Sequence, residues 1–211
     1  MKVLLFTGMP GSGKSEAMSV VNALGIPVYR MGDDIWDEVR SRNLPLTSPN
    51  VGAIATQMRK EHGEQIWAER TLRRIDANRT TAASAAAAAG KPKPDEPPVV
   101  AIDGTRSQAE IDCFRTALGT DLVVVAIHSS SRARHDRLRH RGRADDSSES
   151  GAISDRDRRE LGWGIAEAIA LADVHLANDG SLDMFHARVR ALLEAFLAGH
   201  EPHRAAPQPP R

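Results

Sequence analysis

The segment "GMPGSGKS" constrains the fold more than any other part of the sequence. Its spacing is the G-x-x-x-x-G-K-S pattern of a phosphate-binding loop, carried by Gly8, Gly13, Lys14 and Ser15. The apolar run Val3–Phe6 precedes it, and an apolar helical periodicity that ends at Gly25 follows it. The alternative is a chance glycine turn that contains Lys-Ser, and the strand before it and the helix after it disfavour this alternative. The pattern therefore predicts a strand, a phosphate-binding loop and a helix.

The predicted loop has a defined chemistry. Successive backbone N–H groups of such a loop point inward at a phosphate chain, and the following helix adds the positive end of its dipole. The ammonium of Lys14 reaches the β- and γ-phosphates, and the hydroxyl of Ser15 binds Mg²⁺. We therefore expect ATP and Mg²⁺ as cofactors. The ATP-binding residues predicted within the loop are Gly8, Gly11, Ser12, Gly13, Lys14 and Ser15.

Strand-like and helical patterns alternate along the rest of the chain. The further strand-like runs are Ile26–Tyr29, Val99–Ile102, Leu122–Ile127 and Val174–Ala177. Helical patterns cover residues 33–42, 64–75 and 111–118, and two more begin at Ser48, with Pro49 next, and after a cap at Ser181. Apolar strands alternating with helices predict an α/β fold of three layers, with a parallel sheet covered on both faces. The 211 residues fit one domain, predicted over residues 1–199.

Composition excludes several classes of protein. The chain has 28 Lys plus Arg and 28 Asp plus Glu, so its overall charge predicts no nucleic-acid partner. Cys113 is the only cysteine, which excludes an internal disulfide and suits a reducing compartment. No segment approaches the roughly 18 apolar residues of a membrane span, and the first apolar run is too short for a signal peptide. We expect a cytoplasmic protein without a membrane partner, either a monomer or a small homo-oligomer.

Two segments lack the large apolar side chains of a core. Residues 77–98, "ANRTTAASAAAAAGKPKPDEPP", end in repeated prolines, so we expect a flexible, solvated insertion, with a short helix in the alanine run as the alternative. Residues 200–211, "HEPHRAAPQPPR", are expected to form a disordered tail.

The segment "VVAIDGTRS" predicts a second metal ligand. Asp103 ends a strand, and its carboxylate lies beside the phosphate-binding loop if the two strands are neighbours. An Asp oxygen suits the hard Mg²⁺ ion. The alternative role is a helix cap, for which Ser107 is better placed. We therefore predict Ser15 and Asp103 as metal ligands. The eight histidines show no ligand spacing, so zinc is not expected.

An arginine-rich stretch, "HRGRADDSSESGAISDRDRREL", predicts a small lid over residues 142–156. The fork of donors on arginine suits the charge of a transferring phosphoryl group, and a polar flap excludes water. The alternative is a solvated helix with ion pairs such as Asp155 with Arg159, and for Arg139 this alternative is favoured. For Arg143 and Arg156 the functional role is favoured, which gives Lys14, Arg143 and Arg156 as the predicted catalytic residues.

Five segments in this order resemble the adenylate kinase-like nucleotide kinases. They are "GMPGSGKS", "MGDDIWDEV", "IDGTRS", "RGRADD" with a later "RD", and "ANDGSLDMF". The chain looks similar to the archaeal-type adenylate kinase-related and dephospho-coenzyme A kinase-like P-loop proteins, except over residues 77–98 and the tail. The resemblance implies a five-stranded sheet of order 2-3-1-4-5 and an acceptor-binding helical insertion over residues 32–76.

The resemblance also implies roles for individual residues. Arg137 would lie against the donor base, with Asn178 and Gly180 near the adenine. The lid arginines that contact phosphate would be Arg141, Arg143 and Arg156. The residues implied to bind the acceptor are Gly32, Asp33, Arg40, Arg106 and Arg141.

One departure from the family pattern concerns the acceptor. Trp36 stands where adenylate-type kinases have an arginine that clamps the acceptor phosphate, and Arg40, one helical turn later, is the candidate substitute. Trp36 either belongs to the core or stacks on a base. Asp33 either caps the helix that it begins or, if the acceptor is a hydroxyl, serves as general base.

The predicted reaction is Mg²⁺-dependent transfer of the γ-phosphoryl group of ATP to a small acceptor. A nucleoside monophosphate such as AMP is favoured as the acceptor, and dephospho-coenzyme A or another small alcohol is the alternative. A nucleotide-dependent regulator or assembly factor that hydrolyses ATP slowly is the alternative from another class. Several arginines beside a flexible flap favour the kinase. They would supply from the chain itself the positive charge that a regulator would receive from an arginine of its partner.

Overall fold

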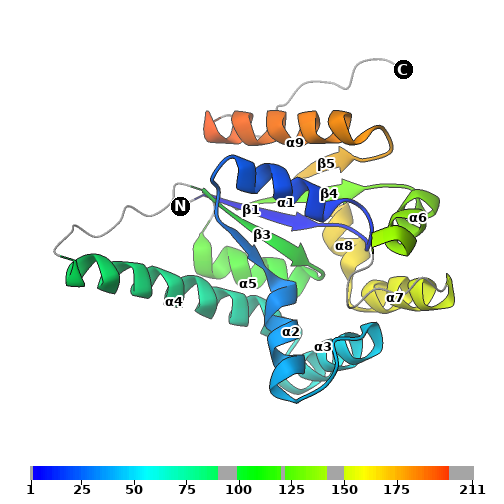
Figure 1. Cartoon of the computed structure of the whole chain (residues 1–211), viewed down its shortest axis with the longest axis horizontal. Coiled ribbons are helices and arrows are strands. Elements are labelled where there is room, and N and C mark those ends of the chain that lie inside the picture. The colour runs from blue at the N-terminus through cyan, green and yellow to red at the C-terminus, as the bar shows by residue number, and fades with distance from the viewer. Residues whose placement is uncertain (1, 90–98, 120–121, 142–149, 200–211) are drawn as a thin grey trace.

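A parallel five-stranded sheet lies at the centre of the molecule (Figure 1). The computed structural model describes residues 2–89, 99–119, 122–141 and 150–199. Within these residues the strand order is β2-β3-β1-β4-β5, as expected. The strands are β1 (Lys2–Thr7), β2 (Val28–Arg30), β3 (Val99–Thr105), β4 (Leu122–His128) and β5 (Val174–Ala177).

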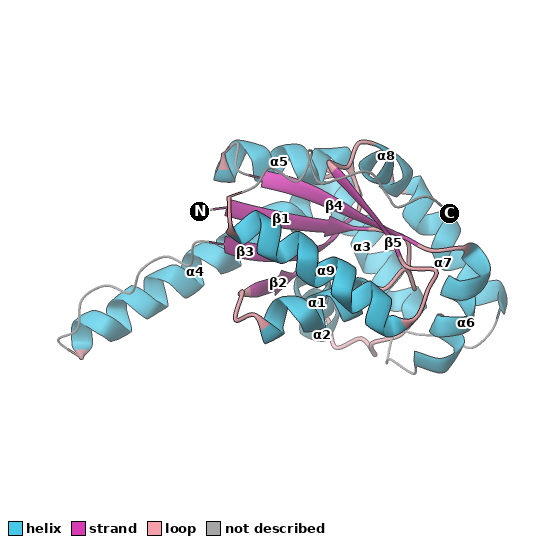
Figure 2. Ribbon diagram, turned by 90° about the horizontal axis from the view of Figure 1, so that it is seen from above, coloured by secondary structure: helices cyan, strands magenta, loops and turns pink. Residues whose placement is uncertain are grey.

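Helices cover both faces of the sheet, which confirms the predicted three layers (Figure 2). On one face α1 (Lys14–Ala23) and α9 (Leu182–Leu197) pack against Leu4 and Phe6 of β1. On the other face Val3 and Leu5 meet a larger set of helices. These are α2 (Met31–Ser41), α3 (Ser48–His62), α4 (Ile66–Ala88), α5 (Gln108–Leu118) and α8 (Ile165–Ala170). Successive side chains of β1 point to opposite faces, so an apolar run is buried on both.

The register of the central strands brings the predicted site together. Phe6 of β1 pairs with Asp103 of β3 and with Val125 of β4. Because the strands are parallel, their carboxyl ends lie at one edge of the sheet, where such folds bind ligands. Asp103 therefore lies beside the loop that follows β1. Two helices, α6 (Ser131–Arg141) and α7 (Ser150–Gly162), complete this edge.

The alanine run is helical. α4 continues from Ile66 to Ala88, so the predicted flexible insertion is wrong for residues 77–88, and the alternative of a helix is what the structure has. Alanine has the highest helix propensity, and here it extends a helix already held by the buried Trp67 and Ile75. The end of α4 projects from the body of the molecule (Figures 1 and 2). The rest of the predicted insertion, residues 90–98, and the predicted tail lie outside the described residues.

The first residues of the helices show whether Asp33 is a helix cap. Ser107 and Ser181 cap α5 and α9 as expected, by accepting hydrogen bonds from Glu110 N and Met184 N. The cap of α2 is Arg30, without a side-chain hydrogen bond. The chain passes directly from β2 into α2, so Asp33 falls inside the first turn. The helix-cap interpretation of Asp33 is therefore wrong.

Helix α3 begins at Ser48. Its cap is Thr47, whose side chain accepts a hydrogen bond from Asn50 N. In the described part of the chain, no helix is both long and apolar enough to cross a membrane.

Candidate functional site

The loop between β1 and α1 has the close-packed backbone that its glycines predict. Gly11 and Gly13 have φ angles of 77° and 115°, which side-chain-bearing residues rarely adopt. A Cβ on Gly11 would lie 2.5 Å from the carbonyl oxygen of Arg134, and one on Gly13 would lie 2.2 Å from Asn178 Nδ2. Both positions therefore require glycine.

Three side chains that are distant in the sequence hold this loop. Asn178, buried after β5, donates a hydrogen bond to the Ser12 carbonyl at 2.8 Å. Arg137 of α6 donates to the Asn178 carbonyl at 2.8 Å and to the Gly11 carbonyl at 3.3 Å. Arg134 donates to the Pro10 carbonyl at 2.8 Å and pairs with Asp157 of α7 at 2.7 Å. The loop is thus preorganised by α6, α7 and the segment after β5.

Lys14 lies at the start of α1 and folds back over the loop. Its ammonium donates to the carbonyls of Gly8 and Met9, the second at 3.2 Å. Burial lowers the pKa of Lys14 to about 8, and Arg106 and Arg156 add to this effect, against the carboxylates of Asp103 and Glu160. A partly desolvated ammonium of this kind is suited to an anionic ligand.

Asp103 fits a magnesium ligand. Its Oδ1 is buried and has no hydrogen-bond partner among the described residues. Asp103 and Ser15 line the same cavity, so the structure brings the two predicted metal ligands together. The described residues hold no group of three His, Cys, Asp or Glu side chains that could bind a metal. Mg²⁺ commonly needs only one or two protein oxygens, because water and phosphate complete its shell.

A cavity of about 660 Å³ opens at the carboxyl ends of the strands. It is lined by the phosphate-binding loop, the end of β3, and residues of α2, α3, α6 and α7. The predicted site residues that line it are Gly11, Gly13, Lys14, Ser15, Gly32, Asp33, Asp103, Arg106, Arg137, Arg141 and Arg156. The size suits small-molecule ligands.

Other predicted residues lie elsewhere. Arg40 does not line the cavity; its side chain is 55% exposed and pairs with Asp37 at 2.9 Å. Ser12 is buried within the loop, and Asn178 donates to the backbone of the loop. Gly180 is exposed, next to Met184. Arg143 falls outside the described residues.

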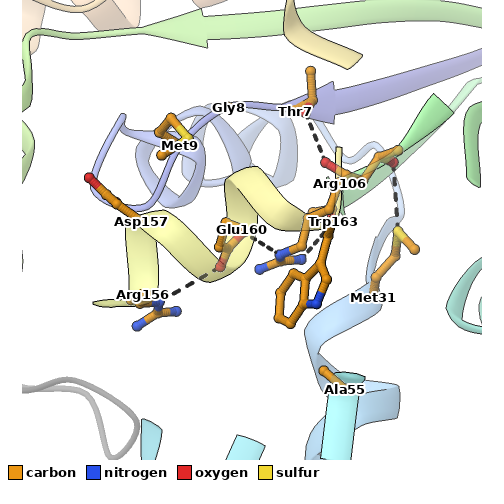
Figure 3. A network of polar contacts seen from close by, with 12 residues as sticks. Thr7, Gly8, Met9, Met31, Ala55, Arg106, Arg156, Asp157, Glu160 and Trp163 are labelled. Carbon is orange, nitrogen blue, oxygen red and sulfur yellow. Dashed lines mark hydrogen bonds and ion pairs between the residues drawn. The ribbon is translucent and has the colours of Figure 1, made fainter. Parts of the chain in front are cut away.

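A buried carboxylate joins two of the predicted arginines (Figure 3). Glu160 Oε2 lies 2.6 Å from Arg106 Nε, and Oε1 lies 3.8 Å from Arg156 Nε. Burial by itself raises the pKa of Glu160, but Arg106, Arg156 and Lys14 outweigh it and lower this pKa to about 2. The carboxylate therefore stays ionised in a cationic surrounding.

Tryptophan side chains form part of the wall near α2 and α3. Trp36 of α2 and Trp163, just after α7, are half-buried and line the cavity, whereas Trp67 is in the core. Trp163 Nε1 donates to Thr56 Oγ1 at 3.2 Å, and the Arg59 guanidinium lies 4.4 Å from its ring centre. These contacts join α7 to α3.

Arg159 belongs to the same contact between helices. A Cβ on Gly52 of α3 would lie 2.4 Å from Arg159 Cζ, so the guanidinium packs on bare backbone.

The predicted surface ion pairs differ in outcome. Asp155 pairs with Arg158 at 2.7 Å, and not with Arg159 as one interpretation of the sequence had it. Arg139 pairs with Asp136 on the surface, as favoured from the sequence.

Sequence reasoning missed Glu160, Arg134 and Asp157. The i, i+4 spacing of Arg156 and Glu160 was visible, but this spacing is common on solvated helices. Arg134 stands among five other arginines between Arg132 and Arg143, and nothing in the sequence distinguishes it.

Comparisons with known proteins agree with this architecture. The profile of an AAA domain family matches residues 7–151. A UPF0200 protein from Methanoculleus marisnigri is 41% identical over 201 residues, which is 95% of this chain and 100% of that protein. A UPF0200 protein from Hyperthermus butylicus is 39% identical over 191 residues, covering 90% of this chain and 92% of that protein.

Solved structures share the fold at low identity. TT1252 from Thermus thermophilus has a TM-score of 0.57 at 18% identity, covering 94% of this chain and 97% of that one. A shikimate kinase from Acinetobacter baumannii has a TM-score of 0.53 at 12% identity, and a gluconokinase from Sinorhizobium meliloti 1021 has 0.51 at 18%. Each of these two covers 94% of both chains. At such identities the likeness concerns the fold alone.

Proposed function

Because this chain belongs to the UPF0200 family and its AAA domain carries an intact phosphate-binding loop, we propose that it is a P-loop kinase. The proposed reaction is Mg²⁺-dependent transfer of the γ-phosphoryl group of ATP to a small acceptor. Two proteins with this fold bear the names gluconokinase and shikimate kinase. Their names agree with phosphoryl transfer but do not identify the acceptor.

One observation carries the proposal. Lys14 and Ser15 of the loop share a cavity with the unsatisfied carboxylate oxygen of Asp103 and with Arg106 and Arg156. Phosphoryl transfer needs little from a protein beyond positioning and neutralisation of charge. This site can supply both positioning and neutralisation of charge. It has the loop amides, a lysine, an oxygen ligand for a cation and two arginines that point into one cavity.

The roles follow from the chemistry of each group. The loop amides and Lys14 would hold the β- and γ-phosphates, and Ser15 and Asp103 would hold Mg²⁺. Mg²⁺, when bound, would neutralise charge that develops on the phosphate oxygens. An acceptor oxygen forms a bond to the γ-phosphorus while the bond to the β–γ bridging oxygen breaks, and ADP leaves. Arg106 and Arg156 would stabilise the charge on the moving group.

For the acceptor we propose a molecule with a planar base, with a nucleoside monophosphate such as AMP as the first candidate. Trp36 supports this choice, because it replaces the expected arginine and presents a half-buried aromatic ring to the cavity. Aromatic side chains stack readily on nucleobases. Arg40 lies 5.8 Å from the centre of the Trp36 ring, so its part would be to support the ring rather than to clamp a phosphate.

Asp33 favours a second candidate, transfer to a hydroxyl group as in dephospho-coenzyme A. Asp33 lines the cavity and does not cap α2. Arg74 lies 3.3 Å from one of its oxygens. A carboxylate here would take the hydroxyl proton as the oxygen attacks phosphorus, whereas a phosphate acceptor is already ionised and needs no base. The variant Asp33→Asn separates the candidates, because only a hydroxyl acceptor requires the carboxylate.

The deciding experiment is a coupled assay of ADP release with Mg²⁺ and ATP. The acceptors are a panel of nucleoside monophosphates and dephospho-coenzyme A, and the variants are Lys14→Ala and, as the matched control, Lys60→Ala on the exposed side of α3. We expect acceptor-dependent, stoichiometric product that Lys14→Ala abolishes and Lys60→Ala retains. Slow hydrolysis that ignores every acceptor and rises with a macromolecular partner would instead support a regulatory ATPase and overturn the kinase.

A further inference from the structure

We propose that Glu160 is a positioning residue for phosphoryl transfer, which holds Arg106 and Arg156 in the cavity and competes with the anionic ligand for them. This inference rests on the proposed function, because it assigns the two arginines to the phosphoryl group. Neither the comparisons nor the sequence patterns single out Glu160.

The geometry places one carboxylate between two structural elements. Arg106 follows β3, whereas Arg156 and Glu160 lie one turn apart on α7. The carboxylate uses a different oxygen for each guanidinium, at 2.6 Å and 3.8 Å (Figure 3). Glu160 therefore ties α7, which includes the second half of the predicted lid, to the edge of the sheet.

The orientation of Arg106 is fixed at both ends of its guanidinium. Nε donates to Glu160, and Nη1 donates to the carbonyl of Gly104. The side chain of Glu160 is only 3% exposed, and that of Arg106 is 16% exposed. Charge-assisted hydrogen bonds are strong and directional where water is largely excluded. Glu160 and the carbonyl of Gly104 together thus determine the orientation of Arg106.

The same pairing sets up a competition. The N–H groups that bind a carboxylate are also the groups that suit phosphate oxygens. A phosphoryl group that enters the cavity meets two arginines whose combined charge Glu160 offsets in part. Glu160 therefore has two opposing effects, since it weakens anion binding while it aligns the arginines for the reaction.

These opposing effects distinguish positioning from a purely structural role. Glu160→Gln keeps the shape of the side chain and removes its charge. If Glu160 positions and competes, this variant binds phosphate ligands more tightly and turns over more slowly. If Glu160 only stabilises the fold, the variant binds no more tightly than the wild type, because a loosened site loses affinity.

The experiment measures binding and turnover separately. Calorimetry with Mg²⁺ and either ATP or pyrophosphate gives the affinity, and the coupled assay gives kcat. For Glu160→Gln we expect affinity about tenfold higher and kcat about 100-fold lower. Affinity equal to or below the wild-type value would overturn the proposal.

Glu38→Gln is the matched control. Glu38 of α2 is also largely buried and also joins two arginines, Arg42 at 2.8 Å and Arg70 at 2.6 Å, but none of the three lines the cavity. We expect this variant to lose stability without binding phosphate more tightly. Tighter binding in both variants would show a general effect of lost charge and would count against the proposal.

A second variant covers the case in which Glu160→Gln does not fold. Glu160→Asp keeps the negative charge and shortens the side chain, so it still offsets part of the charge of the arginines but no longer reaches both of them. We expect wild-type affinity for pyrophosphate with a reduced kcat, and a wild-type kcat would overturn the proposal.

The calorimetric result also separates this inference from the proposed function. If no acceptor is ever phosphorylated, the kinase fails, while the affinity difference between the wild type and Glu160→Gln is still measurable. If the wild type turns over but Glu160→Gln binds no more tightly, the inference fails alone.

Discussion

Asn178 Nδ2 donates a hydrogen bond to the carbonyl oxygen of Ser12 at 2.8 Å, and joins the segment after β5 to the phosphate-binding loop. The sequence predicted Asn178 as a residue near the adenine of ATP. Its observed contact is with the backbone of the loop, so the first effect of changing it should be on loop geometry.

Asn178→Ala should weaken ATP binding. The change leaves the Ser12 carbonyl unsatisfied in a buried place, which costs about 1–3 kcal/mol in the free energy of unfolding. We expect the loop to relax and the affinity for ATP to fall about tenfold, measured by calorimetry and by urea denaturation. Asn22→Ala, on the exposed side of α1, is the control and should change neither quantity. Wild-type affinity in Asn178→Ala would show that the loop holds its shape without this bond.

ATP affinity should decrease as the pH rises through about 8. In the free protein, burial together with nearby arginines lowers the pKa of Lys14 to about 8. Bound phosphates raise this pKa again, so binding above pH 8 takes up a proton, and affinity falls by up to about tenfold per pH unit. Calorimetry in buffers of different ionisation enthalpy measures the proton uptake. Lys14→Arg, which stays charged, should show none. Equal wild-type affinity at about pH 7 and pH 9.5 would refute this mechanism.

Acid should destabilise the wild type more than Glu160→Gln. The folded-state pKa of Glu160, about 2, lies below its usual value of 4.5. The contribution to stability is therefore present above about pH 4.5 and is lost as the pH falls toward 2, and it amounts to roughly 3 kcal/mol. Urea denaturation at several pH values measures it. Parallel curves for the wild type and Glu160→Gln between pH 5 and 2.5 would contradict the lowered pKa.

Replacing only one partner of the buried ion pair between Arg59 and Glu110 should strongly lower the free energy of unfolding. Their side chains are 7% and 0% exposed and lie 2.8 Å apart. Arg59→Met leaves an uncompensated carboxylate, which costs about 3–5 kcal/mol in the free energy of unfolding. The double variant with Glu110→Gln should recover a large part of this loss. If the two single losses simply add in the double variant, the pair contributes no coupling.

The sequence predicted most of the fold because its signals are local. The period of the apolar residues gave the strands and helices, and the apolar run of β1, buried on both faces, indicated a central parallel strand. The strand order came from the resemblance to nucleotide kinases, because local periodicity does not say which strands are neighbours. The length of α4 was underestimated, since prolines near residue 98 outweighed the helix propensity of the alanines.

The candidate site was predicted less completely, for a physical reason. Asp103 lies near the end of β3, and Lys14 and Ser15 follow the short loop after β1, so the positions of the strand ends determine theirs. Glu160 becomes important only when α7 packs beside the end of β3, and no spacing in the sequence encodes that contact. For Arg40 the local spacing suggested a role that the structure does not support. Arg40 lies one helical turn after Trp36, but its side chain forms a surface ion pair with Asp37.

The direction of α4 has a practical consequence. β3 begins at Val99, at the amino edge of the sheet, whereas the reacting groups gather at the opposite edge. The alanine end of α4 is exposed and projects away from both (Figure 2). A fluorescent dye or an affinity handle attached at Ala85 should therefore leave the proposed phosphoryl transfer intact, and lengthening or trimming this helix offers a way to engineer the protein without disturbing the candidate site.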